Sequence, residues 1–229
     1  MKTQRKAYVY AFLAIICWST IGSAFKISLR FIDFRLLLLI SSFIAVLVLF
    51  TILLIQGKFH YLKALRRNEI LNSAFLGFLN PFLYYLVLLK AYDLLPAQEA
   101  GTLNYIWPLA LVLLSIPMLG QKISILSILS ILISFMGIIL ISTHGHVFSF
   151  TFSSPAGVAL ALGSAVFWAF YWILNMKDTR EEVSKLLLNF CFGFLYIFFT
   201  VLSGPRFRIT SWEGLAGAFY LGFFEMGIP

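Results

Sequence analysis

The chain has 229 residues, of which 61% are hydrophobic and 11% charged, with a formal net charge of +8 and a mean hydropathy of +0.96. Soluble domains are closer to half apolar and a quarter charged, so an ordinary soluble fold is excluded. Continuous apolar runs of about 20 residues favour membrane-crossing helices over barrel strands, in which apolar and polar residues would alternate. The predicted fold class is an all-α transmembrane bundle.

Seven complete spans and the start of an eighth follow one another along the chain. They are Tyr8–Lys26, Leu36–Ile55, Ile70–Leu89, Ala100–Leu119, Ile123–Ser142, Gly157–Met176, Leu186–Leu202 and a last one from about Gly214. If the N-terminus is cytoplasmic, the inner segments hold 11 Lys and Arg residues and the outer segments 6, as the positive-inside rule requires. The basic residues therefore set topology, and we expect a lipid bilayer as partner and no nucleic acid.

The first span places Trp18 and Lys26 on one side, with Lys26 near the outer end. A lysine there can snorkel to the interface, or it can bind a carboxylate at the mouth of a cavity. Cys17 and Cys191 both lie inside apolar runs, so we expect no disulfide framework.

The fourth span carries Asn104, Trp107 and Pro108 on one helical face. Because Pro108 cannot donate an N–H and crowds the preceding turn, it predicts a kink that would serve as a hinge. The face is either a polar and aromatic cavity wall or a helix-packing surface with an ordinary membrane proline.

The sixth span carries Trp168, Tyr171 and Asn175 on one face. Aromatic residues usually gather at the level of the lipid headgroups, but Trp168 lies too deep for that belt and should face the bundle. Stacking walls for a flat or apolar ligand and plain core packing both remain open.

Glu225 lies about eleven residues into the eighth span, near mid-membrane, where a charge costs a few kcal/mol even on lenient scales. Asn80 lies at matching depth in the third span, one turn before Tyr84. Two polar residues at equivalent depths suit a binding site, although a protonated glutamate that only packs in the core is the alternative.

An internal repeat relates the two halves. Leu76-Gly77-Phe78-Leu79 matches Leu221-Gly222-Phe223-Phe224 at an offset of 145 residues, Phe50-Thr51-Ile52-Leu53 matches Phe199-Thr200-Val201-Leu202 at 149, and Trp18 matches Trp168 at 150. A unit of five spans makes the second copy enter the membrane from the opposite side. The pattern predicts the inverted repeat of many secondary transporters, with substrate bound near the midplane.

The second copy is shorter than the first. Residues 1–142 form a first repeat of five spans, and residues 155–229 supply only the first three spans of a second. Ten spans in a five-plus-five arrangement are therefore expected of the full protein, with about eight present here.

The repeat, Trp18-Ser19-Thr20 with Lys26, the Asn104–Pro108 stretch and Phe167–Tyr171 together resemble the drug/metabolite transporter superfamily, EamA branch. The fourth span is most similar to the aromatic amino acid exporter type. The resemblance implies export of amino acids or related small metabolites across the bacterial inner membrane by alternating access.

Two other classes of membrane protein are alternatives to a transporter. An intramembrane enzyme is disfavoured because Asp93 has no second intramembrane aspartate and all three histidines lie in loops. His144 and His146 lack further ligands nearby, so no metal or cofactor is expected. A non-transporting or regulatory membrane fragment is the remaining alternative. Substrate, coupling ion and oligomeric state, including a homo-oligomer, stay open.

Overall fold

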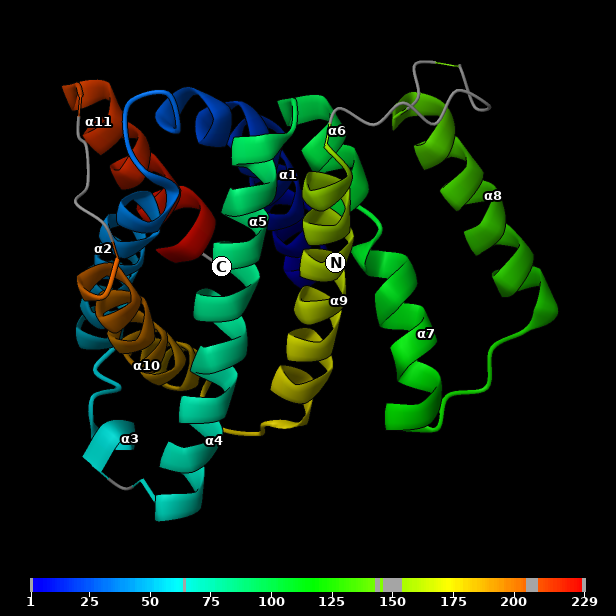
Figure 1. Cartoon of the computed structure of the whole chain (residues 1–229). Helices are drawn as coiled ribbons and strands as arrows, with labels where there is room; N and C mark the ends of the chain where they lie inside the picture. The colour runs from blue at the N-terminus through cyan, green and yellow to red at the C-terminus, as the bar shows by residue number, and fades with distance from the viewer. Residues whose placement is uncertain (1, 64, 143–144, 146–153, 205–209, 228–229) are drawn as a thin grey trace.

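The computed structural model describes residues 2–63, 65–142, 145, 154–204 and 210–227. Its regular elements are helices (Figure 1). In chain order they are α1 (Lys2–Ser28), α2 (Phe34–Ile55), α3 (His60–Lys63), α4 (Arg67–Gly77), the π-helical η1 (Phe78–Leu83), α5 (Tyr84–Leu94), α6 (Ala97–Asn104), α7 (Trp107–Leu119), α8 (Ile125–Ser142), α9 (Pro155–Lys177), α10 (Glu182–Leu202), α11 (Trp212–Tyr220) and the π-helical η2 (Leu221–Gly227).

Five helical stretches among the described residues are long and apolar enough to cross a membrane. They are Phe34–Ile55, Arg67–Leu94, Ala97–Leu119, Pro155–Lys177 and Glu182–Leu202, and they coincide with the predicted second, third, fourth, sixth and seventh spans. The shorter apolar stretches Ile15–Ser28 and Ile125–Gly137 overlap the predicted first and fifth spans. The all-helical, multi-pass class is confirmed, while a total of eight spans stays a prediction.

The bundle is organised around five neighbouring helices. α10 packs on α2 and on α4, and α5 packs on α9. α2 presents Leu38, Ala45 and Leu49 to this interior, and α10 presents Leu187 and Ile197. These fully or almost fully buried aliphatic side chains make a protein core inside the bilayer, because their helices bury one face against each other and leave the other to lipid.

The third predicted span is continuous but broken in geometry. Asn80, inside η1, has φ −146° and ψ 123°, which is extended rather than helical. The ring of Pro81 disfavours the helical region for the residue before it, so the sequence Asn80-Pro81 accounts for the break. A second interruption separates α6 from α7 at Tyr105 and Ile106, in the turn before Pro108.

Two glycines let segments approach closely. A Cβ on Gly77 would overlap the backbone carbonyl oxygen of Asn189 in α10. A Cβ on Gly222 would lie 2.5 Å from the carbonyl oxygen of Ser41 in α2. Both helix pairs therefore cross at backbone-to-backbone contact, which glycine alone permits.

The loops that follow α1 and α9 are built alike. Asp33 accepts hydrogen bonds from the backbone N–H and Nε of Arg35, and Asp178 accepts the same two bonds from Arg180. The first loop docks on the segment before α11, where Thr210 donates its N–H to the Phe31 carbonyl at 2.9 Å. The second loop bonds to α4, where Arg180 donates to Oγ of Ser73. Each loop therefore ties the start of the next helix to a distant part of the chain.

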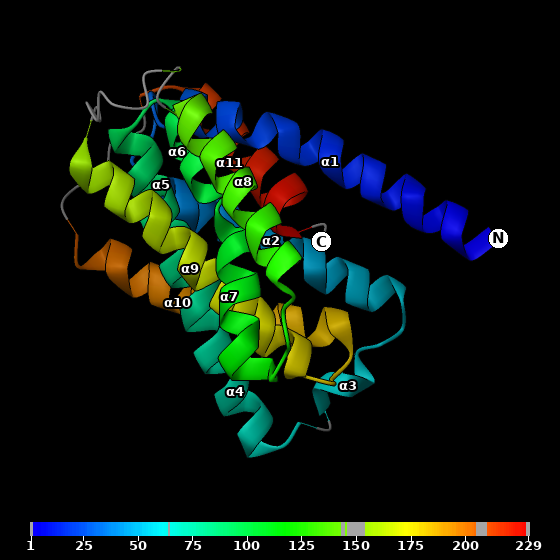
Figure 2. The same ribbon diagram turned by 90° about the vertical axis from the view of Figure 1, so that its right-hand side faces the viewer.

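The outermost helices stand apart from this core. α8 packs on α6 and lies at the right-hand edge of Figure 1. The N-terminal part of α1 projects away from the bundle in the view of Figure 2. Large apolar side chains on both helices, among them Phe12, Ile15, Leu126 and Ile133, are exposed on the protein and available to lipid.

Candidate functional site

A row of aromatic rings runs through the middle of α9 and onto the start of α5. Trp168 stacks on Tyr84 with ring centroids 4.5 Å apart and an interplanar angle of 29°, and it lies 6.0 Å from Tyr171 and 5.8 Å from Trp172. Tyr84 is the first residue of α5 after the broken segment η1. The break thus aims a tyrosine at the tryptophan that the sequence predicted to face the bundle.

Asn104 borders this row from the end of α6. Its Nδ2 donates a hydrogen bond of 2.9 Å to Oγ of Ser164, one turn before Trp168 on α9. Asn104 also interacts with the side chain of Tyr84. The interruption after α6 therefore leaves its last residue bonded to α9 and beside Tyr84 of α5.

Glu225 of η2 contacts α5 through the residue next to Tyr84. Its Oε1 accepts a hydrogen bond of 3.1 Å from the hydroxyl of Tyr85, while its Oε2 is buried without a hydrogen-bond partner. Among the described residues no cation pairs with this carboxyl group. Tyr85 and Tyr84 are adjacent and in ring contact at 4.7 Å, so Glu225 is two side chains away from Trp168.

A second polar group joins Asn80 of η1, Tyr171 of α9 and Asn189 of α10. Relative exposures are 4%, 2% and 0%. The apolar side chains of Leu76 and Leu79 pack with Tyr171 beside it. Asn80 and Tyr171 are among the residues predicted from the sequence, but Asn189 is not. Its signal in the sequence is an amide side chain within the strongly apolar helix α10.

Other candidates lie elsewhere. Trp18 is 45% exposed on α1. Lys26 donates from Nζ to the backbone carbonyls of Tyr92 and Leu95 at 2.7 and 2.8 Å, so it caps the end of α5. Asn175 lies at the far end of α9, where its carbonyl accepts a bond from Lys185. These three positions stay predictions, together with Trp107, which is half-buried at the start of α7.

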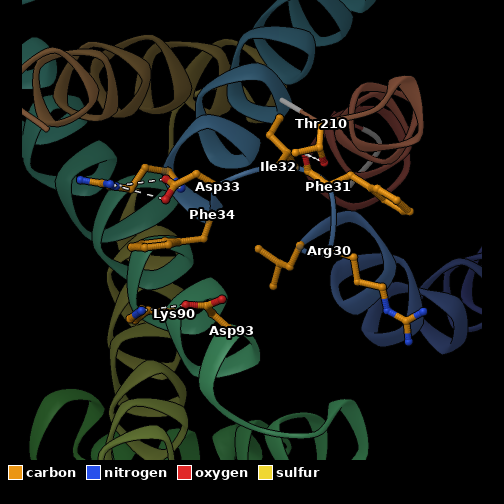
Figure 3. Close-up of a pocket in the computed structure, with 10 residues that line it drawn as sticks. Arg30, Phe31, Ile32, Asp33, Phe34, Lys90, Asp93 and Thr210 are labelled. Atoms are coloured by element: carbon orange, nitrogen blue, oxygen red, sulfur yellow. Dashed lines mark hydrogen bonds and ion pairs between the residues drawn. The ribbon is translucent and has the colours of Figure 1, made fainter. Parts of the chain in front are cut away.

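A hollow of about 480 Å³ opens at the end of the bundle, away from the aromatic row (Figure 3). Lys90 pairs with Asp93 at 2.7 Å on one side, and Arg35 pairs with Asp33 at 3.1 Å on another. Its lining comprises Leu29, Arg30, Phe31, Ile32, Asp33, Phe34, Arg35, Lys90, Asp93 and Thr210. Sequence reasoning did not anticipate this hollow, because it depends on how two loops meet.

The opposite end of the bundle carries a charge cluster at the α9–α10 loop. Partial burial acts to raise the pKa of the Glu181 carboxyl, but hydrogen bonds from Lys58 (2.8 Å) and Ser184 outweigh it and lower that pKa to about 2. Partial burial also acts to raise the pKa of the Asp178 carboxyl. Hydrogen bonds from Arg180 outweigh this effect, so that the pKa of Asp178 is lowered. Arg180 also donates to Ser73 Oγ at 2.9 Å, which ties this loop to α4.

Among the described residues no three His, Cys, Asp or Glu side chains lie together as metal ligands. His144 and His146 lie outside the described residues.

The apolar spans, the protein core between them and the buried polar and aromatic row define a multi-pass helical membrane protein. The sequence matches the EamA-like transporter family over residues 5–143, which is more than half of the chain. The chain therefore belongs to the EamA-like transporter family.

One curated relative and one solved structure extend this finding. The chain is 27% identical over 111 residues to the aromatic amino acid exporter YddG of Ancylobacter novellus, a match that covers 48% of this chain and 38% of the exporter. The alignment thus spans well under half of the relative's length. A crystal structure shares the fold with a TM-score of 0.70 at 22% identity, covering 98% of this chain and 76% of that one.

Proposed function

We propose that this chain belongs to a transporter that exports amino acids or related small metabolites by alternating access. The observation that carries the proposal is the stack of Trp168 on Tyr84, flanked by Asn104 and, through Tyr85, by Glu225. A stacked aromatic wall accepts flat apolar groups, and the amide and carboxyl groups supply directional contacts to a polar end. Similarity to an aromatic amino acid exporter supports this substrate class.

The proposed architecture is an inverted repeat, in which a unit of five spans is followed by a second copy of opposite orientation in the membrane. Three pairs of local features support it: the π-helical segments η1 and η2, the close approaches at Gly77 and Gly222, and the Asp-x-Arg turns after α1 and α9. In each pair the two members lie 145 residues apart or nearly so. Inverted repeats place substrate between the halves, where two equivalent conformations open to opposite sides.

In this proposal Pro108 and the interruption before it act as a hinge. The break between α6 and α7 lies beside the aromatic row through Asn104, so bending there would move a wall of the cavity. Trp18, Lys26, Trp107 and Asn175 are retained as cavity candidates of other conformations. The proposed location is the bacterial inner membrane with a cytoplasmic N-terminus.

Topology has its own test. A cysteine at Gly145, in the Cys17→Ser and Cys191→Ser background, should react in intact cells with a membrane-impermeant thiol reagent. Labelling only after lysis would reverse the proposed orientation.

Transport is tested by efflux of radiolabelled phenylalanine from preloaded cells that express the chain. Trp168→Ala should lower the initial efflux rate while membrane insertion is kept. Trp212→Ala is the matched control, because Trp212 is 71% exposed and far along the chain from the row. Equal rates in both variants would remove Trp168 from the site. Efflux no faster than in cells without the chain would instead favour the non-transporting or regulatory alternative.

A further inference from the structure

Asn80, Tyr171 and Asn189 form a buried polar cluster that the proposed aromatic cavity does not use. They come from three elements, of which η1 packs against both α9 and α10. The close approach at Gly77 brings η1 and α10 together next to Asn189. The cluster is therefore held by the tightest helix contact of this part of the bundle.

Its polar atoms are unpartnered. Oδ1 of Asn80, the hydroxyl oxygen of Tyr171 and both amide atoms of Asn189 are buried and make no hydrogen bond. The amides of Asn80 and Asn189 lie close enough to the Tyr171 hydroxyl to interact with it, yet no pair has hydrogen-bond geometry. Since buried polar groups in native proteins are almost always bonded, four such atoms in one cluster indicate a ligand site.

The chemistry of the cluster selects the class of ligand. Its acceptors are neutral oxygens, two from amides and one from a phenol, and the three side chains supply no carboxylate, thiolate or imidazole. Divalent cations favour carboxylate ligands, and soft metals favour sulfur or imidazole. Rings of neutral oxygens serve monovalent cations, whose hydration shell they replace.

The backbone points to the same class. The helix is broken at Asn80, and Pro81 has no N–H to offer the preceding turn. Discontinuous membrane helices use such unwound segments to coordinate Na⁺ near the midplane.

We propose that Asn80, Tyr171 and Asn189 bind Na⁺ through Oδ1, the hydroxyl oxygen and Oδ1, respectively. Nδ2 of Asn189 then donates to a water carried by the ion. Tyr171 lies 6.0 Å from Trp168 and 6.4 Å from Trp172, so the bound ion adjoins the aromatic row and orders the ring that faces it. This site goes beyond the proposed transport function, because Na⁺ binding requires no amino acid.

The test is thermal unfolding of the purified full chain in detergent, with NaCl exchanged for choline chloride at constant ionic strength. Na⁺ should raise Tm saturably by about 2–4 °C, since a ligand that binds only the folded state stabilises it by mass action. Tryptophan fluorescence should change over the same Na⁺ range, because two tryptophans adjoin Tyr171.

Tyr171→Phe removes one ligand and keeps the ring, so it should weaken the Na⁺ dependence at least several-fold; Asn189→Leu should abolish it. Tyr196→Phe is the matched control, because its hydroxyl bonds to the Ala74 carbonyl at 3.3 Å in the same region and should be dispensable for Na⁺. An unchanged Tm and fluorescence when choline replaces Na⁺ would overturn the proposal. Equal Na⁺ dependence in wild type and Tyr171→Phe would do so as well. Neither result bears on phenylalanine efflux, so the two proposals fail separately.

Discussion

The segments around Gly77 and Gly222 have similar backbone features but carry different polar side chains. Each glycine adjoins or lies within a π-helical segment and meets the backbone of a neighbouring helix, α10 in one case and α2 in the other. Three residues further on, the first segment carries Asn80 and the second Glu225. Asn80 is buried with its Oδ1 unpartnered, whereas Glu225 accepts a hydrogen bond from the Tyr85 hydroxyl. Close packing fixes the backbone at both places, and the polar residue placed there is free to differ.

The largest expected effect comes from filling either glycine. Gly77→Ala and Gly222→Ala should each destabilise the fold by about 3 kcal/mol or more, because the new methyl group meets a neighbouring backbone that cannot move aside. Gly77→Ala should be the more severe, since backbone atoms of both Asn189 and Gly193 surround it. The measurement is the yield of monodisperse protein and its Tm in detergent. Gly163→Ala in α9 is the control, because nothing lies within 4 Å of its added Cβ; equal losses in all three would show that packing is not the cause.

Replacing the carboxyl group of Glu225 by an amide tests whether transport depends on that carboxyl group. Glu225→Gln keeps an oxygen that can accept from Tyr85, so Tm should change little. Phenylalanine efflux should fall by about tenfold, the size expected from the loss of one charged hydrogen bond to substrate. Asp93→Asn, in an exposed pair with Lys90, should leave the rate unchanged. A normal rate for Glu225→Gln would reduce this carboxyl group to a packing residue.

Two lysines that cap helix ends should rank by burial. Lys185 is only 4% exposed and donates to the carbonyls of Asn175 and Asp178, whereas Lys26 is half-buried and donates to those of Tyr92 and Leu95. Lys185→Met should lower stability by about 2 kcal/mol and Lys26→Met by about 1 kcal/mol. Thermal unfolding measures both. If Lys26→Met were the more destabilising of the two, Lys26 would stabilise the fold by more than its two bonds to backbone carbonyls.

The smallest expected effect is on the thermal stability of the protein at acidic pH. Because the folded-state pKa of Glu181 is lowered to about 2 from an ordinary value of 4.5, its contribution to stability is present above about pH 4.5 and is lost as the pH falls toward 2. The pair with Lys58 is partly exposed, so the effect is small. Glu181→Gln should flatten the fall of Tm between pH 5 and 3, measured against wild type; a parallel curve would assign the acid sensitivity to other carboxyl groups.

Sequence reasoning predicted the helices because the bilayer constrains them so strongly. Five of the eight predicted spans recur as membrane-capable helices, since length and apolarity decide that property locally. It also predicted Trp168, Tyr84, Asn104 and Glu225 as site residues. In the structure they lie around α5 and α9, and their role in binding stays a prediction.

What it missed depends on tertiary contacts. Whether Lys26 is available to a ligand depends on where α5 ends, and that end supplies the carbonyls that it bonds. Asn189 becomes significant only because Gly77 brings α10 against η1. The Asn80-Pro81 pair is a sequence signal for the break at Asn80, because Asn-Pro marks a turn. The surrounding apolar run, however, predicts a single continuous helix.

The isolation of α8 has a consequence for how this protein varies. That helix packs on α6, and most of its side chains face outward. Few protein side chains pack against this helix. Selection on it therefore acts on the apolar character of its side chains, which lets them face lipid, rather than on their shape. Isoleucine, leucine and methionine should therefore interchange freely along residues 125–137 during evolution, while the glycine-lined crossings of α4 and α10 stay almost invariant.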